Sequence, residues 1–98
     1  MADKELVFED FRDKVGECFA LPELRSSAMA LTLKEAEPLP RGLPGRRPPF
    51  SLVFVGKHAV VLPQRLYQLE HTALGPVSIF LVPIGRNADG VCYQATFN

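Results

Sequence analysis

A period-two alternation of apolar and polar side chains recurs along most of the chain after Ala28. Successive side chains of a β-strand point to opposite faces, so this pattern predicts strands with one buried face. The alternating segments are 28–34, 50–55, 65–71 and 91–97. With the apolar runs 59–62 and 77–84 and a segment from 17 to 21, they predict about six short strands. We therefore expect a mainly β fold, either a small antiparallel β-barrel or a sheet folded on itself.

The alternation also predicts which side chains form the core. Phe50, Leu52 and Phe54 share one face of their strand, as do Tyr67, Leu69 and His71. The run 77–84 is apolar almost throughout, which is typical of a central strand covered on both faces. Phe80 is therefore expected in the core with Phe54. The segment 85–90 ends in Asp-Gly and predicts a hairpin loop.

The segment before the first strand has a helical pattern instead. Phe8, Phe11 and Val15 recur at helical spacing, with charged residues between them. Gly16 is a natural stop, because glycine adopts the left-handed conformation at a helix end without a Cβ penalty. We expect one short N-terminal helix.

Residues 37–49 interrupt the strand pattern with five prolines, two glycines and three arginines. Proline supplies no backbone donor, so this stretch is predicted to be a long exposed loop that pairs with no strand. Its basic residues are Arg41, Arg46 and Arg47. Nucleic-acid binding usually joins such a cluster to net basicity and stacking aromatics, but the pI is 6.7 and the loop has no aromatic residue. The loop is expected to be solvated, with protein-partner contacts as the alternative.

Length and composition limit the class of protein. The 98 residues suit one domain spanning 1–98, with enough hydrophobic residues, 47%, for a core. No apolar run reaches the roughly 20 residues of a membrane helix. The opening MADKELVFED is acidic and resembles no secretory signal, so we expect a cytoplasmic protein. Cys18 and Cys92 are too far apart in sequence to form a ligand pair, and are expected to be reduced thiols.

The sequence contains no recognisable catalytic or cofactor motif. His58 and His71 are its two histidines, and no third ligand follows at metal-binding spacing. Ser78 is not preceded by the glycine-flanked elbow of a hydrolase nucleophile. We therefore expect no enzyme, no metal and no cofactor.

Opposite charges gather in opposite parts of the chain. Residues 1–37 hold nine acids and five bases, whereas residues 38–98 hold six bases and two acids. The formal net charge is zero. This asymmetry favours internal pairing across one domain, with head-to-tail attraction between copies as the alternative.

Several stretches together resemble a family of small bacterial β-rich proteins of unknown function. They are Pro49–Phe54, Leu62–His71, Leu74-Gly75, Phe80–Gly85 and Tyr93–Phe97, and the likeness spans nearly the whole chain. The resemblance implies an antiparallel β domain and carries no activity or catalytic residue. It also suggests an assembly role, as in a phage-tail-like complex.

We expect a non-catalytic interaction or assembly module that contacts a protein partner or another copy of itself. The alternative is a small-ligand-binding barrel whose mouth carries Tyr67, His71 and Tyr93. The last strand, 91–97, contains no charge or proline to protect an edge. It is therefore expected either inside the sheet or paired between subunits of a homo-oligomer.

Overall fold

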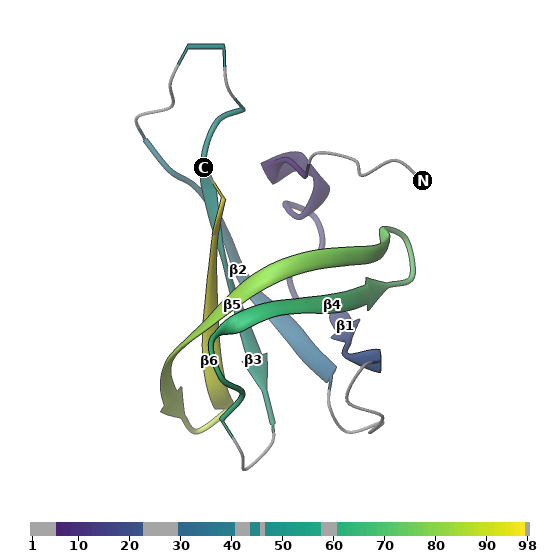
Figure 1. The fold of residues 1–98 in the computed structure, drawn as a ribbon, viewed down its shortest axis with the longest axis vertical. Coiled ribbons are helices and arrows are strands. Elements are labelled where there is room, and N and C mark those ends of the chain that lie inside the picture. The colour runs from purple at the N-terminus through teal and green to yellow at the C-terminus, as the bar shows by residue number, and fades with distance from the viewer. Residues whose placement is uncertain (1–5, 23–29, 41–43, 46, 58–60, 98) are drawn as a thin grey trace.

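The six strands of the computed structural model form one antiparallel sheet that closes into a barrel (Figure 1). The structure describes residues 6–22, 30–40, 44–45, 47–57 and 61–97. The strands are β1 (Cys18–Ala20), β2 (Ala30–Pro38), β3 (Phe50–Gly56), β4 (Arg65–His71), β5 (Gly75–Asn87) and β6 (Gly90–Phe97). Around the barrel their order is β1-β2-β3-β6-β5-β4, and β4 returns to β1. The predicted fold class is confirmed.

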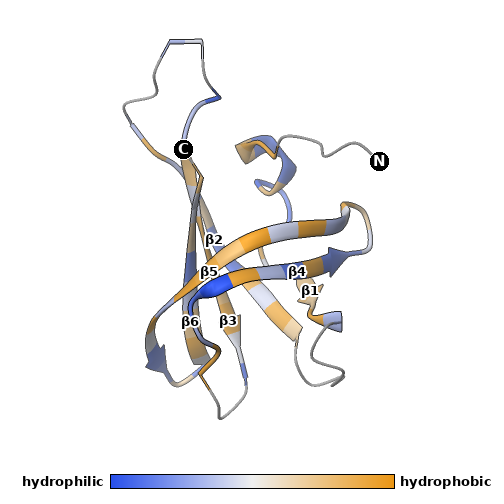
Figure 2. Ribbon diagram, viewed as in Figure 1, coloured by the Kyte–Doolittle hydropathy of each residue, from blue (hydrophilic) through white to orange (hydrophobic). Residues whose placement is uncertain are grey.

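Apolar side chains from every strand fill the barrel. Along β3 and β4 the buried residues alternate as the sequence pattern predicts, with Phe50, Leu52 and Phe54 on one strand and Tyr67 and Leu69 on the other. The other fully buried strand residues include Phe19, Leu31, Leu33, Ile79, Leu81 and Tyr93. Figure 2 shows the same alternation as bands of apolar and polar residues along the strands.

β6 lies inside the sheet. It pairs with β3 from Phe50↔Phe97 to Gly56↔Val91, and with β5 on its other side. Of the two positions expected for the uncharged last strand, the one inside its own sheet is confirmed. Gly90 begins β6 at φ 134°, and a Cβ there would lie 2.3 Å from the carbonyl oxygen of Gly56. Only glycine allows the two strands to approach this closely.

The N-terminal segment forms a 3-10 turn, η1 (Phe8–Asp10), instead of the predicted amphipathic helix. The carboxylate of Asp10 accepts a hydrogen bond from the backbone N–H of Val7 at 3.0 Å, which tightens the turn. Phe11 is fully buried, but Val15 is 48% exposed, so the expected apolar stripe does not form. Phe11 and Phe8, whose ring centres lie 5.9 and 6.3 Å from that of Phe50, pack this segment against the barrel.

The start of the proline-rich segment belongs to the sheet. β2 continues through Glu37 and Pro38, which pair with Ser51 and Phe50 of β3. The backbone N–H of Leu39 donates to the carbonyl of Pro49 at 2.9 Å. The prediction that residues 37 and 38 pair with no strand is therefore wrong, because proline is tolerated at a strand end where its missing donor is not needed. Arg41 and Arg46 lie outside the described residues.

β5 departs from the expectation of a strand covered on both faces. Val77, Ile79 and Leu81 point into the barrel, whereas Phe80 is 48% exposed and Ile84 is 52% exposed. A strand in a single closed barrel has one face on the core and one on the outside, however apolar its sequence. The core position predicted for Phe80 is wrong.

The predicted short strand 59–62 lies partly outside the described residues. Its described part, Val61 and Leu62, is not in a strand. Leu62 is nevertheless buried and packs against the core.

The hairpin loop predicted for 85–90 is shorter than expected. β5 extends to Asn87, so only Ala88 and Asp89 form the turn between β5 and β6.

Within the described part of the chain, no helix is long and apolar enough to cross a membrane.

Replacing Phe54 or Phe80 with alanine compares how much a side chain on the inner face and one on the outer face contribute to stability. Phe54 is fully buried, so Phe54→Ala should lower the free energy of unfolding by about 3–5 kcal/mol. Phe80→Ala should cost about 1 kcal/mol or less, because half of that ring already contacts water. Urea denaturation of both variants measures the difference, and equal losses would contradict the face assignment.

Candidate interaction surface

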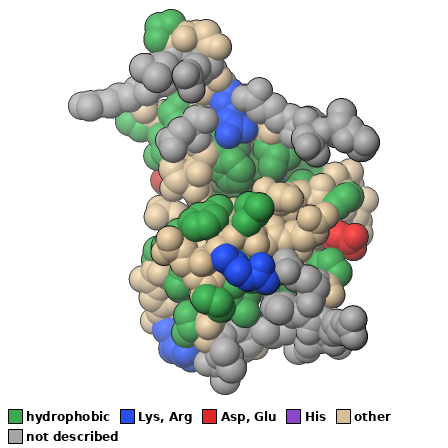
Figure 3. Space-filling model, viewed as in Figure 1, with side chains coloured by type: hydrophobic (Ala, Val, Ile, Leu, Met, Phe, Trp, Pro, Cys, Tyr) green, Lys and Arg blue, Asp and Glu red, His purple; other side chains and the backbone are tan. Residues whose placement is uncertain are grey.

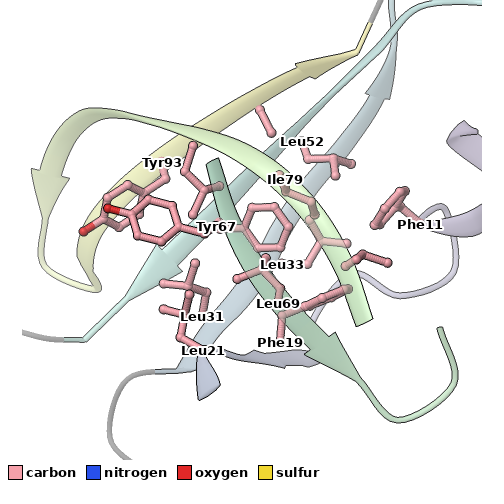
Figure 4. Close-up of a cluster of buried hydrophobic side chains, with 14 of the residues drawn as sticks. Phe11, Phe19, Leu21, Leu31, Leu33, Leu52, Tyr67, Leu69, Ile79 and Tyr93 are labelled. Carbon is pink, nitrogen blue, oxygen red and sulfur yellow. The ribbon is translucent and has the colours of Figure 1, made fainter. Parts of the chain in front are cut away.

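Tyr67 and Tyr93, predicted at the mouth of a ligand-binding barrel, do lie together at one end of the barrel (Figure 4). Both are buried in the core, at 1% and 0% exposure. The hydroxyl of Tyr67 donates to the carbonyl of Pro63 at 2.6 Å, and the hydroxyl of Tyr93 accepts from the backbone N–H of Leu62 at 3.0 Å. The two phenols thus hold the 62–63 segment across this end of the barrel.

His71 lies elsewhere, at the β4–β5 turn. Its Nδ1 accepts the backbone N–H groups of Ala73 and Leu74 at 3.0 and 3.2 Å. The proton therefore sits on Nε2, which donates to a carboxylate oxygen of Glu17 at 2.6 Å. The ring also packs against Phe19, with centroids 4.7 Å apart. His71 thus links the turn to the segment before β1, and we call this contact the Glu17–His71 latch.

The third predicted group, the arginines of the proline-rich loop, is described only at Arg47. Its guanidinium carbon lies 5.9 Å from the ring centre of Phe50 and 5.4 Å from that of Phe97. The side chain also donates to the backbone carbonyl of Leu6. Arg47 therefore packs over the barrel end, whereas the sequence predicted a solvated side chain.

The largest exposed apolar side chains of the sheet lie on the outside of β4 and β5. Leu66, 56% exposed, stands opposite Phe80, 48% exposed, in the register of these two strands. Farther along β5, Val82 is half-buried and Ile84 is 52% exposed. We call Leu66, Phe80, Val82 and Ile84 the front face. Figure 3 shows apolar and basic side chains gathered over these strands, with acidic ones near the margins.

A basic side chain lies beside the front face. The guanidinium of Arg65 lies 4.2 Å from the ring centre of Tyr67 and donates to the carbonyl of Leu66 at 2.9 Å. Arg86, although exposed, stands opposite the buried Val91 and so lies on the other face of β5 from Phe80. Front-face contacts would therefore be made beside the positive charge of Arg65.

A shallow hollow of about 400 Å³ lies beside the β5–β6 hairpin. It is lined by Lys57, Arg86, Asn87, Ala88, Asp89 and Gly90. The carboxylate of Asp89 is held by Lys34 at 2.9 Å, an interaction that lowers the pKa of Asp89 and raises that of Lys34. Among the described residues, no three His, Cys, Asp or Glu side chains converge on a possible metal position.

Both cysteines are free thiols, as expected. Cys18 is exposed on β1, and the half-buried sulfur of Cys92 accepts from the side-chain amide of Asn87 at 3.4 Å.

Sequence reasoning missed the front face because it assigned the whole run 77–84 to the core. One signal was available: an antiparallel barrel buries only one face of each strand. An apolar residue on both parities of such a strand therefore indicates an exposed apolar face.

The chain belongs to the family described as a domain of unknown function, DUF6916, whose profile matches residues 6–97. The predicted resemblance to a family of unknown function is thereby confirmed. Neither a curated protein nor a solved structure matches the chain.

The Glu17–His71 latch should contribute measurably to stability. Glu17→Ala removes the acceptor of a buried imidazole N–H and should lower the free energy of unfolding by about 1 kcal/mol. Glu17→Gln keeps an acceptor oxygen and should lose less. Urea denaturation compares the two, and nitrogen NMR should find the proton of wild-type His71 on Nε2. Equal losses, or a proton on Nδ1, would contradict the latch.

Burial should make Tyr93 sensitive to alkaline pH. Burial raises the pKa of Tyr93 above the ordinary value of 10.0, and the hydrogen bond from Leu62 opposes this in part. Above about pH 10 the unfolded tyrosine loses its proton before the folded one, so stability should fall as pH rises. Unfolding midpoints across this pH range should decline less steeply for Tyr93→Phe. An identical slope for the two proteins would contradict the prediction.

Proposed function

We propose that this member of the DUF6916 family is a non-catalytic interaction module, a small component of a larger protein complex that it contacts through the front face. One observation carries the proposal: Leu66 and Phe80 stand directly opposite each other on the outside of the barrel, about half exposed. A smaller or more polar cross-strand pair would also stabilise the sheet. Stability of the sheet therefore does not require exposed side chains as large and apolar as these. Exposed apolar groups that are contiguous usually mark a contact surface.

The neighbouring residues support a protein partner. Ile84 extends the exposed apolar surface along β5, and Arg65, which contacts Leu66, adds a basic group at its margin. An apolar centre with a polar rim is the usual anatomy of a protein–protein interface, where arginine is enriched. The partner expected here is a protein surface with apolar and acidic side chains.

The alternative, a small-ligand-binding barrel, has less support. Tyr67 and Tyr93 are buried within the core and hold the 62–63 segment, and His71 is engaged in the latch. Binding inside the barrel would require displacing these side chains. A ligand role would instead suit the hollow beside the β5–β6 hairpin, which is shallow.

Photocrosslinking tests the front face directly. A photoreactive phenylalanine in place of Phe80 should form covalent adducts of discrete mass in cells that express the full chain. The matched control is the same residue at Thr72, which is also exposed but lies in the β4–β5 turn. Adducts that are absent at position 80, or identical at both positions, would contradict a contact through the front face.

A further inference from the structure

We infer that the front face docks on the outer face of β2 and β3 of a second copy of this chain, so that copies associate head to tail. This inference rests on the proposed function and names its partner. We call the outer face of β2 and β3, with Glu35, Glu37, Ser51 and Val53, the back face.

The barrel places the two faces on opposite sides. In the ring order β1-β2-β3-β6-β5-β4, β5 is three strands away from β2, and β4 is three strands away from β3. In a ring of six strands this is the greatest possible separation. One copy can therefore offer its front face and its back face to two different neighbours at once.

The back face is acidic at its centre. Glu35 stands opposite Val53 in the β2–β3 register, and Glu37 stands opposite Ser51. Both glutamates are exposed, and within the described part of the chain neither forms a salt bridge. The half-buried side chain of Val53 supplies an apolar group beside them.

The two faces are complementary in charge. Arg65 lies beside Leu66 of the apolar front face, and Glu35 and Glu37 form the centre of the back face. Attraction between them would orient two copies as they meet, and burial of Leu66 and Phe80 would hold them together. The residues that define the front face include no acid, so a contact of this face with itself lacks this attraction.

The contact joins two different surfaces, so it does not close after two copies. Head-to-tail contacts of this kind produce rings or open chains, in contrast to symmetric dimers. Glu35 and Glu37 come from the acidic part of the sequence, 1–37, and Arg65 comes from the basic part, 38–98. The uneven distribution of charge along the sequence thus places unlike charges on opposite surfaces. Part of the charge is used internally, as in the 2.9 Å pair between Lys34 and Asp89.

Sedimentation of the pure full chain tests self-association. We expect species heavier than the 10.9 kDa monomer in the micromolar to millimolar range, and weaker association as salt increases. Phe80→Glu should raise the dissociation constant at least about tenfold, and Thr72→Glu, at the exposed β4–β5 turn outside both faces, should leave it unchanged. Circular dichroism confirms that each variant is folded, and Leu66→Ser provides a milder second variant.

Mixing two variants tests the head-to-tail arrangement. Phe80→Glu blocks the front face, and Glu35→Lys with Glu37→Lys blocks the back face. Each variant alone should be monomeric, yet a mixture should form a one-to-one complex, because each retains the face that the other has lost. Glu9→Lys with Asp13→Lys changes the net charge equally on the N-terminal segment and should still self-associate.

Three results would overturn the inference. A monomeric wild type throughout this range would exclude self-docking, and if crosslinks at position 80 still joined a different protein, the proposed function would stand. Self-association that survives the Lys substitutions at Glu35 and Glu37 would indicate a symmetric contact. Monomeric variants that fail to combine would exclude the head-to-tail contact.

Discussion

The barrel depends on its narrowest junction, where β1 meets β4. β1 has three residues, and its register with β4 contains a single paired position, Ala20↔Glu70. Side chains add to this limited backbone pairing. The Glu17–His71 latch spans the junction, and the ring of Phe19 lies 4.7 Å from that of His71. Without these contacts, β4 and β5 would be joined to the other strands chiefly through the pairing of β5 with β6.

Besides strand pairing, the closed barrel needs side chains that fill its two ends. At one end Phe11 packs against Phe19, Phe50 and Phe97, with ring centres 5.9–6.2 Å apart. At the other end Tyr67 and Tyr93 hold the 62–63 segment through their hydroxyls. Aromatic rings suit this task because each covers a large area with few rotatable bonds. Because the interior is filled in this way, a partner of the kind we propose would contact the outside of the barrel.

The sequence predicts the strands well because alternation and burial have one cause. Leu31, Leu33, Phe50, Leu52 and Phe54 all occupy the inner positions that period two assigns to them. Alternation cannot assign a face where apolar residues occupy both parities, as they do in 77–84 apart from Ser78, so the core position predicted for Phe80 is wrong. Nor can local pattern predict that Glu17 reaches His71 across 54 residues, because tertiary closure alone brings them together. For the same reason local pattern cannot predict the packing of Arg47. Its guanidinium lies over the rings of Phe50 and Phe97, which come together only when β3 and β6 pair.

Closure of the barrel also determines which surfaces of the sheet are available for contacts. An open sheet would expose two edges as well as its faces, and unpaired backbone groups would then compete for partners. In the ring β6 pairs with strands on both sides, so its uncharged sequence needs no protection. The contacts that we propose would be made by side chains on outward positions, where apolar β5 and acidic β2 lie three strands apart. A small closed barrel with unlike opposite faces is therefore suited to directional contacts between protein surfaces.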